Sequence, residues 1–496
     1  MMSLRPRTIA IIGAGPAGLV AAKYFRAEKA FDKISIFEQR SFIGGIWNYT
    51  PEDRSESLLN VPQTDPSGQN QDPVWRECSQ NSIHDGDISR QNGVRKLASF
   101  VSPIYEKLES NIPRGLMGFQ NLNWPKESQL FPKHETVLEY IKEYGKDVQD
   151  LVQFETQVVN VEEAESNSWK VTTRNLRSGT SQREIYDAVV VANGHFIVPY
   201  IPNIPGINCW NEEYPGQITH SKYFRNASEF TNKKVIVVGN SASGIDISSQ
   251  IATVSQHPLL WSIKSTSMFQ PMSDPRKLDL PPISKFHISN RAVEFEDGTI
   301  ERDIDAVVFA TGYFYSLPFL KDVKPDLIAD GSHVQHTYQH LFYTPRPTLS
   351  FLALPQRIIP FPVSEAQSAV LARVFSGRLS LPPLHEMRKW EEKVIEKMGA
   401  GRNFHLLPFP KDGNYINELS NWALTAPPRE GLENEGKGKL APVWGEWEFW
   451  CRENFPRIRG AFGAKGEERH NIRTLEELGF VYEDNVKQVA REERLI

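Results

Sequence analysis

The chain has 496 residues, of which 40% are hydrophobic and 24% charged, and its formal net charge at pH 7 is −5. This composition excludes a disordered or fibrous chain, and at about 150 residues per domain the length predicts two or three domains. The nearly balanced charge gives no electrostatic reason to expect nucleic acid or an anionic membrane as a partner.

The cysteines and the hydropathy pattern exclude further classes. Cys78, Cys209 and Cys451 lie far apart and form no CxxC motif, so we predict no disulfide framework, no redox-active dithiol and no metal site. No run of about 18 apolar residues occurs, and the N-terminus lacks the small-residue cleavage site of a signal peptide. We therefore expect a cytoplasmic protein without a membrane anchor.

The first predicted elements form a dinucleotide-binding unit. A β-branched run at 8–12 predicts a buried strand, a helical stretch follows at 17–29, and a second strand at 33–37 ends at Glu38. Between the first strand and the helix stands a GxGxxG loop, which consists of Gly13, Ala14, Gly15, Pro16, Ala17 and Gly18. The glycines allow a tight turn and let a pyrophosphate approach backbone N–H groups, and Glu38 stands where a carboxylate binds a ribose diol. The alternative is a glycine turn that serves packing alone.

The next part of the chain is less informative. Residues 51–95 are polar with scattered Pro and Gly, which predicts a long surface loop. Alternating segments at 158–161 and 169–173 predict strands of a meander, and DAVVVANG at 187–194 predicts another buried strand.

A second strand–loop–helix unit follows the proline-rich linker 199–206. Its strand spans 235–239, and its degenerate glycine loop consists of Gly239, Asn240, Ser241, Ala242, Ser243 and Gly244. DAVVFATG at 305–312 closes the unit and agrees with DAVVVANG at six of eight positions, which suggests two related modules, with chance as the alternative. Lys264 occupies the place that Glu38 has in the first unit. A cation there favours the 2′-phosphate of NADP(H) over NAD(H), whereas the alternative for Lys264 is a solvated lysine at a strand end.

Two such units predict an α/β fold with two Rossmann-like dinucleotide-binding domains, for FAD and NADPH, the smaller NADPH domain being inserted in the larger FAD domain. We expect the FAD domain at 1–199 and 312–496 and the NADPH domain at 200–311. The C-terminal part should be a helical extension, with a helix at 384–398 and one or two peripheral helices in the last thirty residues. One resident and one exchanging cofactor describe a flavoprotein that a nicotinamide reduces.

Further motifs resemble those of one enzyme family. The segments similar to flavin-containing monooxygenases are the GGxW turn at 42–47, YEKLESNIP at 105–113, ATGY at 310–313 and FPVSEAQ at 361–367. YPGQITHSKYF at 214–224 resembles the FxGxxxHxxx(Y/F) fingerprint of class B flavoprotein monooxygenases, with Tyr214 in place of the first Phe. The resemblance is closest to soluble fungal, yeast-type members.

The resemblance implies two catalytic candidates, Asn111 and His220. Asn111 would lie beside the isoalloxazine, facing the oxygen and nicotinamide site, whereas His220 is explained equally well as a structural hinge. The expected FAD-binding residues are Gly13, Gly15, Pro16, Ala17, Gly18, Glu38, Gln39, Gly45, Ile46, Trp47, Asn111 and Gln367. The expected NADPH-binding residues are Gly239, Ser241, Ala242, Ser243 and Lys264. Further cofactor-binding candidates are Val158, Thr311 and Gly312.

The resemblance also implies the reaction. The family uses FAD, NADPH and O2 and passes one oxygen atom from a C4a-hydroperoxyflavin to a soft small-molecule nucleophile, which is an amine, a thiol or a thioether. Three alternatives stay open: a Baeyer–Villiger monooxygenase, whose fingerprint typically ends in Trp where this chain has Phe224, an amino-acid N-hydroxylase, and a redox-sensing or scaffolding protein without turnover. The substrate, the choice between nitrogen and sulfur, and the formation of a homodimer are not decided by the sequence.

Overall fold

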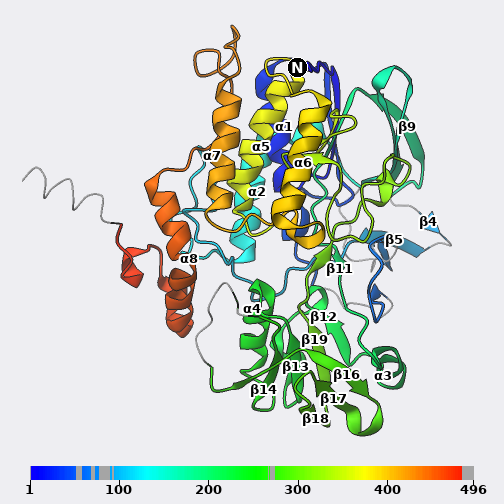
Figure 1. Cartoon of the computed structure of the whole chain (residues 1–496), viewed down its shortest axis with the longest axis vertical. Helices are drawn as coiled ribbons and strands as arrows, with labels where there is room; N and C mark the ends of the chain where they lie inside the picture. Colours follow the sequence, from blue (N-terminus) through cyan, green and yellow to red (C-terminus); the bar gives the residue numbers. More distant parts are fainter. Residues whose placement is uncertain are drawn as a thin grey trace, which may run out of the picture.

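The computed structural model describes most of the chain. The described residues are 2–51, 58–68, 73–77, 90–91, 94–265, 267 and 274–482. They form two bodies of unequal size, each built on a largely parallel sheet (Figure 1). Parts of the polar segment 51–95, including Cys78, and the final residues 483–496 lie outside the described residues.

The larger body contains a seven-stranded sheet in the order β21-β22-β23-β10-β1-β2-β6. Strands β23, β10, β1, β2 and β6 pair in parallel, and β21 and β22 add an antiparallel edge. The strands are β1 (Thr8–Ile12), β2 (Lys33–Phe37), β6 (Val152–Gln153), β10 (Ala188–Val191), β21 (Thr337–Tyr338), β22 (Phe342–Tyr343) and β23 (Leu349–Phe351). The apolar runs of β1 and β10 are buried almost throughout, as expected for central strands covered on both faces.

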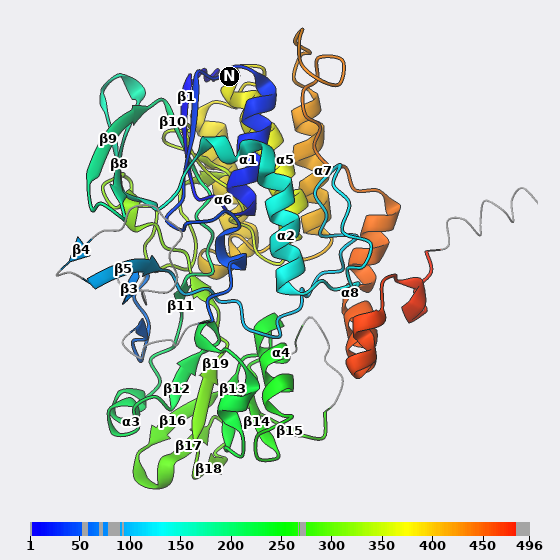
Figure 2. The ribbon, with the colours of Figure 1, turned by 180° about the vertical axis from the view of Figure 1, so that it is seen from behind.

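Helices cover one face of this sheet and a meander packs on the other (Figures 1 and 2). The helices of this body are α1 (Pro16–Glu28), α2 (His134–Gly145), α5 (Pro360–Phe375), α6 (Leu384–Met398), α7 (Lys411–Leu424) and α8 (Glu446–Ala464). The meander strands are β7 (Thr156–Glu163), β8 (Trp169–Asn175) and β9 (Ser181–Tyr186). Both meander segments and the helix at 384–398 are therefore confirmed.

The smaller body holds a second, entirely parallel sheet in the order β12-β19-β13-β14-β15. Its strands are β12 (Ile218–His220), β13 (Val235–Val238), β14 (Leu259–Ser262), β15 (Lys277–Leu280) and β19 (Ala306–Phe309). The other elements are α3 (Ile207–Glu213), α4 (Ala242–Ile251) and the antiparallel strands β16 (Ile283–His287), β17 (Ala292–Phe295) and β18 (Ile300–Glu301).

The chain enters and leaves the smaller body at one place. Strand β11 (Val198–Pro199) leads out of the larger body, β20 (Tyr313–Phe314) leads back, and the two pair in an antiparallel manner. The second sheet is thus an insertion between two parts of the first body, which confirms the predicted fold class.

Two segments differ from the sequence-based expectation. Two strands within the segment predicted to be loop, β3 (Val74–Glu77) and β4 (Arg90–Gln91), pair with β5 (Val94–Ser99), which begins at the end of that segment. The three form an antiparallel sheet, because cross-strand pairing offsets a polar composition. In the described part of the last thirty residues, only short 3₁₀ turns form, at Gly466–Asn471 and Glu476–Leu478. No helix of the described residues is long and apolar enough to cross a membrane.

Candidate functional site

The first glycine loop has the backbone geometry that requires glycine. Gly13 has a φ of 106°, and a Cβ added there would lie 2.6 Å from the carbonyl oxygen of Ala192 at the end of β10. A Cβ on Gly18 would lie 1.9 Å from the oxygen of Gly13. A Cβ on Gly15, by contrast, would meet only Gly45, with its Cα at 3.7 Å and its nitrogen at 4.0 Å. Protein packing therefore demands Gly13 and Gly18, whereas a Cβ on Gly15 would make only ordinary contacts. Gly15 is the N-cap of α1, where a helix N-terminus can bind a pyrophosphate.

The GGxW turn packs directly against this loop. The N–H of Gly44 donates to the oxygen of Ala14 at 2.9 Å, and both Gly44 and Gly45 have positive φ angles. Gly45, Ile46 and Trp47 form a short 3₁₀ helix and are half-buried. The turn thus brings these three predicted FAD contacts to the first loop.

Glu38 lies at the carboxyl end of β2, within reach of the loop. Its Oε2 accepts a hydrogen bond from the N–H of Ala14 at 2.8 Å, and its Oε1 accepts one from the N–H of Arg40 at 2.8 Å. Burial raises the pKa of the Glu38 carboxyl, and these backbone donors partly offset the effect. The half-buried Gln39 follows it. A carboxylate at this strand end fits the ribose of FAD.

The second loop repeats the geometry of the first. Gly239 also has a φ of 106°, and a Cβ on it would lie 2.6 Å from the oxygen of Ala310 at the end of β19. A Cβ on Gly244 would lie 2.1 Å from the oxygen of Gly239. Ser241, the N-cap of α4, has φ −84° and ψ −171°, close to the −73° and −179° of Gly15. The serine at the middle position therefore preserves a loop of the same shape.

Lys264 is exposed just beyond the carboxyl end of β14, beside the second loop. The side-chain amide of Asn240 donates to the oxygen of Ser265, which ties the segment that carries Lys264 to that loop. Ligands of parallel sheets bind at the carboxyl ends of the strands. The exposed Ser241 and the half-buried Ala242 and Ser243 complete this predicted NADPH contact surface.

We expect Lys264→Glu to raise the KM for NADPH by about 10- to 100-fold, because one charge-assisted hydrogen bond is worth about 1.5–3 kcal/mol. The KM for NADH should change little, since NADH carries no 2′-phosphate. The matched control is Lys233→Glu, an exposed lysine at the opposite, amino end of β13. If Lys264→Glu raised the KM for NADPH and the KM for NADH equally, Lys264 would not bind the 2′-phosphate.

His220 lies between the two bodies and is completely buried. Its Nδ1 accepts a hydrogen bond from the N–H of Lys222 at 3.1 Å, and its Nε2 donates to the oxygen of Gly312 at 3.0 Å. Burial lowers its pKa to about 3. Nearby, the hydroxyl of Thr311 donates to the oxygen of Tyr200. Both ring nitrogens hold backbone groups of the domain connection, which is the arrangement of a hinge residue; a catalytic role of His220 remains a prediction.

Buried histidines should make the fold sensitive to acid. Burial lowers the pKa of His220 and His340 to about 3 and that of His195 to about 4. Below pH 6.5 the unfolded chain therefore binds protons that the folded chain excludes, and each histidine removes about 1.4 kcal/mol of stability per pH unit. Glu365, whose pKa burial raises to about 7, acts in the opposite direction between pH 4.5 and 7. We expect the unfolding temperature to fall between pH 6.5 and 5 in circular dichroism, and His220→Gln to make the fall shallower.

Asn111 is half-buried on the segment between β5 and α2. The neighbouring Ser110 is buried, and its N–H donates to the oxygen of Pro132 at 2.7 Å within the larger body. A few residues earlier, the hydroxyl of Tyr105 donates to the carboxylate of Asp246 on α4 of the smaller body. The segment that carries Asn111 thus connects the two bodies, where the two cofactors have to meet.

Two residues predicted to bind a cofactor, Val158 and Gln367, have side chains that contact other parts of the protein. The side chain of Val158 is buried in the core between the meander and the sheet. Gln367 on α5 is fully buried, its Oε1 accepts a hydrogen bond from the N–H of Ala353 at 2.8 Å, and its Nε2 donates to the hydroxyl of Tyr415 at 3.0 Å. The side-chain amide of Gln367 is therefore committed to the protein, and a flavin contact by either residue remains a prediction.

Two features of the site escaped the sequence analysis. His195 follows β10, and its buried Nε2 has no hydrogen-bond partner among the described residues, beside the strand end that contacts Gly13. The ANGH sequence directly after a buried strand was the available signal. A pocket of about 510 Å³ opens next to Trp47. It is lined by Arg40, Ser41, Phe42, Trp47, Asn48, Tyr49, Thr50, Ala98, Ser99, Phe100, Glu106, His134, Glu135, Leu138 and Glu139. These residues come from separate segments of the chain, and no single sequence motif contains them all, so the sequence did not predict the pocket.

Comparisons with known proteins agree with this geometry. A family model described as flavin-binding monooxygenase-like matches residues 95–275 and 282–425, and one described as an NAD(P)-binding Rossmann-like domain matches 11–76. The flavin-containing monooxygenase FMO GS-OX-like 2 of Arabidopsis thaliana is 34% identical over 437 residues, which cover 84% of each chain. A thiol-specific monooxygenase of Saccharomyces cerevisiae is 31% identical over 86% of this chain and 87% of that protein. The solved structure of S-allyl-L-cysteine S-oxygenase from Allium sativum is 27% identical, with a TM-score of 0.73 and 100% of both chains covered.

Proposed function

Because this chain belongs to the flavin-binding monooxygenase-like family, we propose that it transfers one oxygen atom of O2 to the sulfur of a small thiol or thioether. The protein is an FAD-dependent monooxygenase that consumes NADPH, so the proposal concerns the acceptor atom. The observation that supports sulfur is the similarity over the whole chain to an S-oxygenase, together with that to a thiol-specific monooxygenase.

The described residues fit both cofactors in this reaction. The first loop and Glu38 would hold the pyrophosphate and ribose of FAD, and the second loop with Lys264 would hold NADPH. When bound, these cofactors supply the electrons that activate O2. One oxygen atom forms the new S–O bond, the other leaves as water, and NADPH becomes NADP⁺. A thioether lone pair attacks without deprotonation, so the reaction needs no general base, in keeping with a neutral His220 that is bound to backbone groups.

The cysteines that the structure describes provide no internal electron acceptor. Cys209 is exposed on α3 and Cys451 is buried in α8, and both are free. A disulfide reductase needs two thiols side by side next to the flavin. Electrons from the flavin would therefore pass to O2, and an external nucleophile would supply the other two electrons as its sulfur is oxidised.

An assay of NADPH consumption together with product mass tests the proposal. The panel should contain small thiols, thioethers, tertiary amines and a cyclic ketone. We expect a mass increase of one oxygen atom for thioethers, and for thiols a disulfide formed when the sulfenic acid condenses with a second thiol and releases water. NADPH consumed and product formed should be nearly equal in amount. Preferred oxidation of the amines would replace the sulfur assignment by N-oxygenation, and a lactone from the ketone would indicate Baeyer–Villiger chemistry. A preparation that releases only hydrogen peroxide with every compound would refute oxygen transfer.

A further inference from the structure

The C-terminal part of the chain, beyond the family match that ends at residue 425, packs against the segment that carries Asn111. Phe462 of α8 is fully buried, and its ring centroid lies 4.7 Å from that of Phe131. The N–H of Leu130 donates to the oxygen of Ile472 at 2.8 Å. We call residues 446–482 the C-terminal clamp. Besides these apolar and backbone contacts, the buried ion pair of Arg452 Nε with Asp412 on α7, at 2.7 Å, holds the clamp on the larger body.

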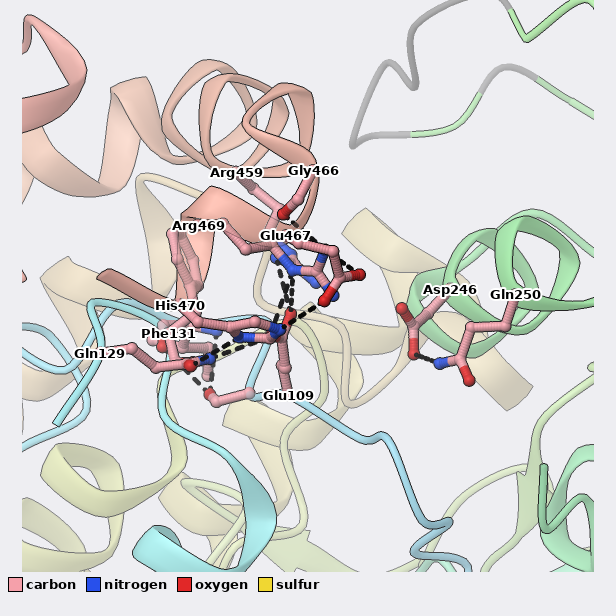
Figure 3. Close-up of polar contacts among 12 residues, drawn as sticks. Glu109, Gln129, Phe131, Asp246, Gln250, Arg459, Gly466, Glu467, Arg469 and His470 are labelled. Carbon is pink, nitrogen blue, oxygen red and sulfur yellow. Dashed lines mark hydrogen bonds and ion pairs between the residues drawn. The ribbon is translucent and has the colours of Figure 1, made fainter. Parts of the chain in front are cut away.

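The docking of the clamp encloses one carboxylate, that of Glu109, two residues before Asn111 (Figure 3). The Glu109 side chain is only 7% exposed. Its partners are Arg469 Nε at 3.1 and 3.2 Å, Gln129 Nε2 at 2.9 Å, His470 Nδ1 at 3.4 Å and Arg459 Nη1 at 3.9 Å. Three of these four partners come from the clamp. A buried carboxylate needs such partners, since burial without them is costly.

Arg459 links this cluster to the smaller body. Burial raises the pKa of the Asp246 carboxyl on α4, the positive charge of Arg459 lowers it, and the negative charge of Glu109 raises it. Asp246 also accepts hydrogen bonds from the hydroxyl of Tyr105 and from Gln250 Nε2, the latter at 3.0 Å. The clamp therefore places a cation near one carboxylate from each body, and Asn111 stands two residues after one of them.

Backbone contacts hold the chain at Glu109 and at Ser110, the residue before Asn111. Glu109 pairs with Lys133 in an antiparallel bridge, and the N–H of Ser110 donates to the oxygen of Pro132 at 2.7 Å. Gln129, which binds Glu109, also donates to the oxygen of Phe131 at 2.6 Å. The loop thus has little freedom to move unless the Glu109 cluster is broken.

We propose that Arg469, assisted by Arg459 and His470, is a positioning residue, which holds the Asn111 loop at the junction of the two bodies through Glu109. The C-terminal clamp thereby determines what share of the consumed NADPH gives oxygenated product, and what share gives hydrogen peroxide by the reaction NADPH + H⁺ + O2 → NADP⁺ + H2O2. This consequence rests on the oxygenation proposed above, whereas the positioning itself does not.

The test uses three full-length variants: Glu109→Gln, Arg469→Gln and the double variant that carries both substitutions. The control is Arg457→Gln, which changes an exposed arginine on α8. Hydrogen exchange followed by mass spectrometry reads the mobility of residues 108–114 without any turnover. We expect exchange there to rise about tenfold in both single variants, because local opening becomes easier when a buried pair is broken. The double variant should be no worse than the worse single variant, since the two residues act through each other. In the control, hydrogen exchange at residues 108–114 should be the same as in the parent.

The second measurement is hydrogen peroxide released per NADPH, with a substrate that the parent oxygenates. We expect a severalfold rise in both single variants, with unchanged FAD content and an unchanged KM for NADPH. Unchanged exchange at 108–114, or additive effects in the double variant, would overturn the positioning role. If the parent itself yields only peroxide, the proposed oxygenation fails, and the exchange data still decide whether the clamp positions the loop.

Discussion

Gly13→Ala is expected to yield a protein that purifies without bound FAD and unfolds at a clearly lower temperature. The substitution would place a Cβ 2.6 Å from a backbone oxygen at a φ of 106°. The strained backbone costs about 1–3 kcal/mol, and the overpacking adds a similar amount. The measurements are the flavin absorbance per polypeptide and thermal unfolding.

The matched variant is Gly239→Ala, which has the same φ and the same approach distance in the other sheet. It should remain yellow and be bleached by dithionite, but not by NADPH, under nitrogen. Gly15→Ala separates folding from binding, because its Cβ makes only ordinary contacts. We expect the Gly15→Ala apoprotein to unfold at the temperature of the parent apoprotein and to bind FAD more weakly. Loss of FAD by Gly239→Ala alone would reverse our assignment of the loops.

Asn111→Asp is expected to lower the rate of product formation by about 100-fold while NADPH oxidation continues. An asparagine amide both donates and accepts hydrogen bonds, whereas a carboxylate only accepts. Loss of one preorganised donor at a reacting centre costs about 10²–10³ in rate. The measurement is the ratio of product to NADPH consumed, together with hydrogen peroxide released.

The control for this substitution is Asn121→Asp, which adds the same charge at an exposed position of the same segment. Asn121 has a φ of 64°, which aspartate tolerates. This variant should couple NADPH oxidation to product as the parent does. Equal coupling in Asn111→Asp and the parent would exclude Asn111 from the reacting centre, and equal losses in both variants would point to a general effect of charge.

The sequence determined the parts of this protein that depend on neighbours along the chain. A β-branched strand, a glycine loop, a helix and an acid within about 30 residues specify a βαβ unit. The repeated octets correctly indicated a second unit, since a Cβ added to Gly13 or Gly239 would lie equally close to the carbonyl oxygen of Ala192 or Ala310. These features were predictable because turn geometry and burial act over short separations.

Only the tertiary structure decided which distant segments meet. Glu109 and Arg469 are 360 residues apart, and each has charged neighbours that predict a solvated surface equally well. His220 carries a family fingerprint, yet only the fold shows both of its nitrogens bound to backbone groups. The physical reason is that a side chain's role depends on its burial and its partners, and long-range packing sets both after local structure has formed.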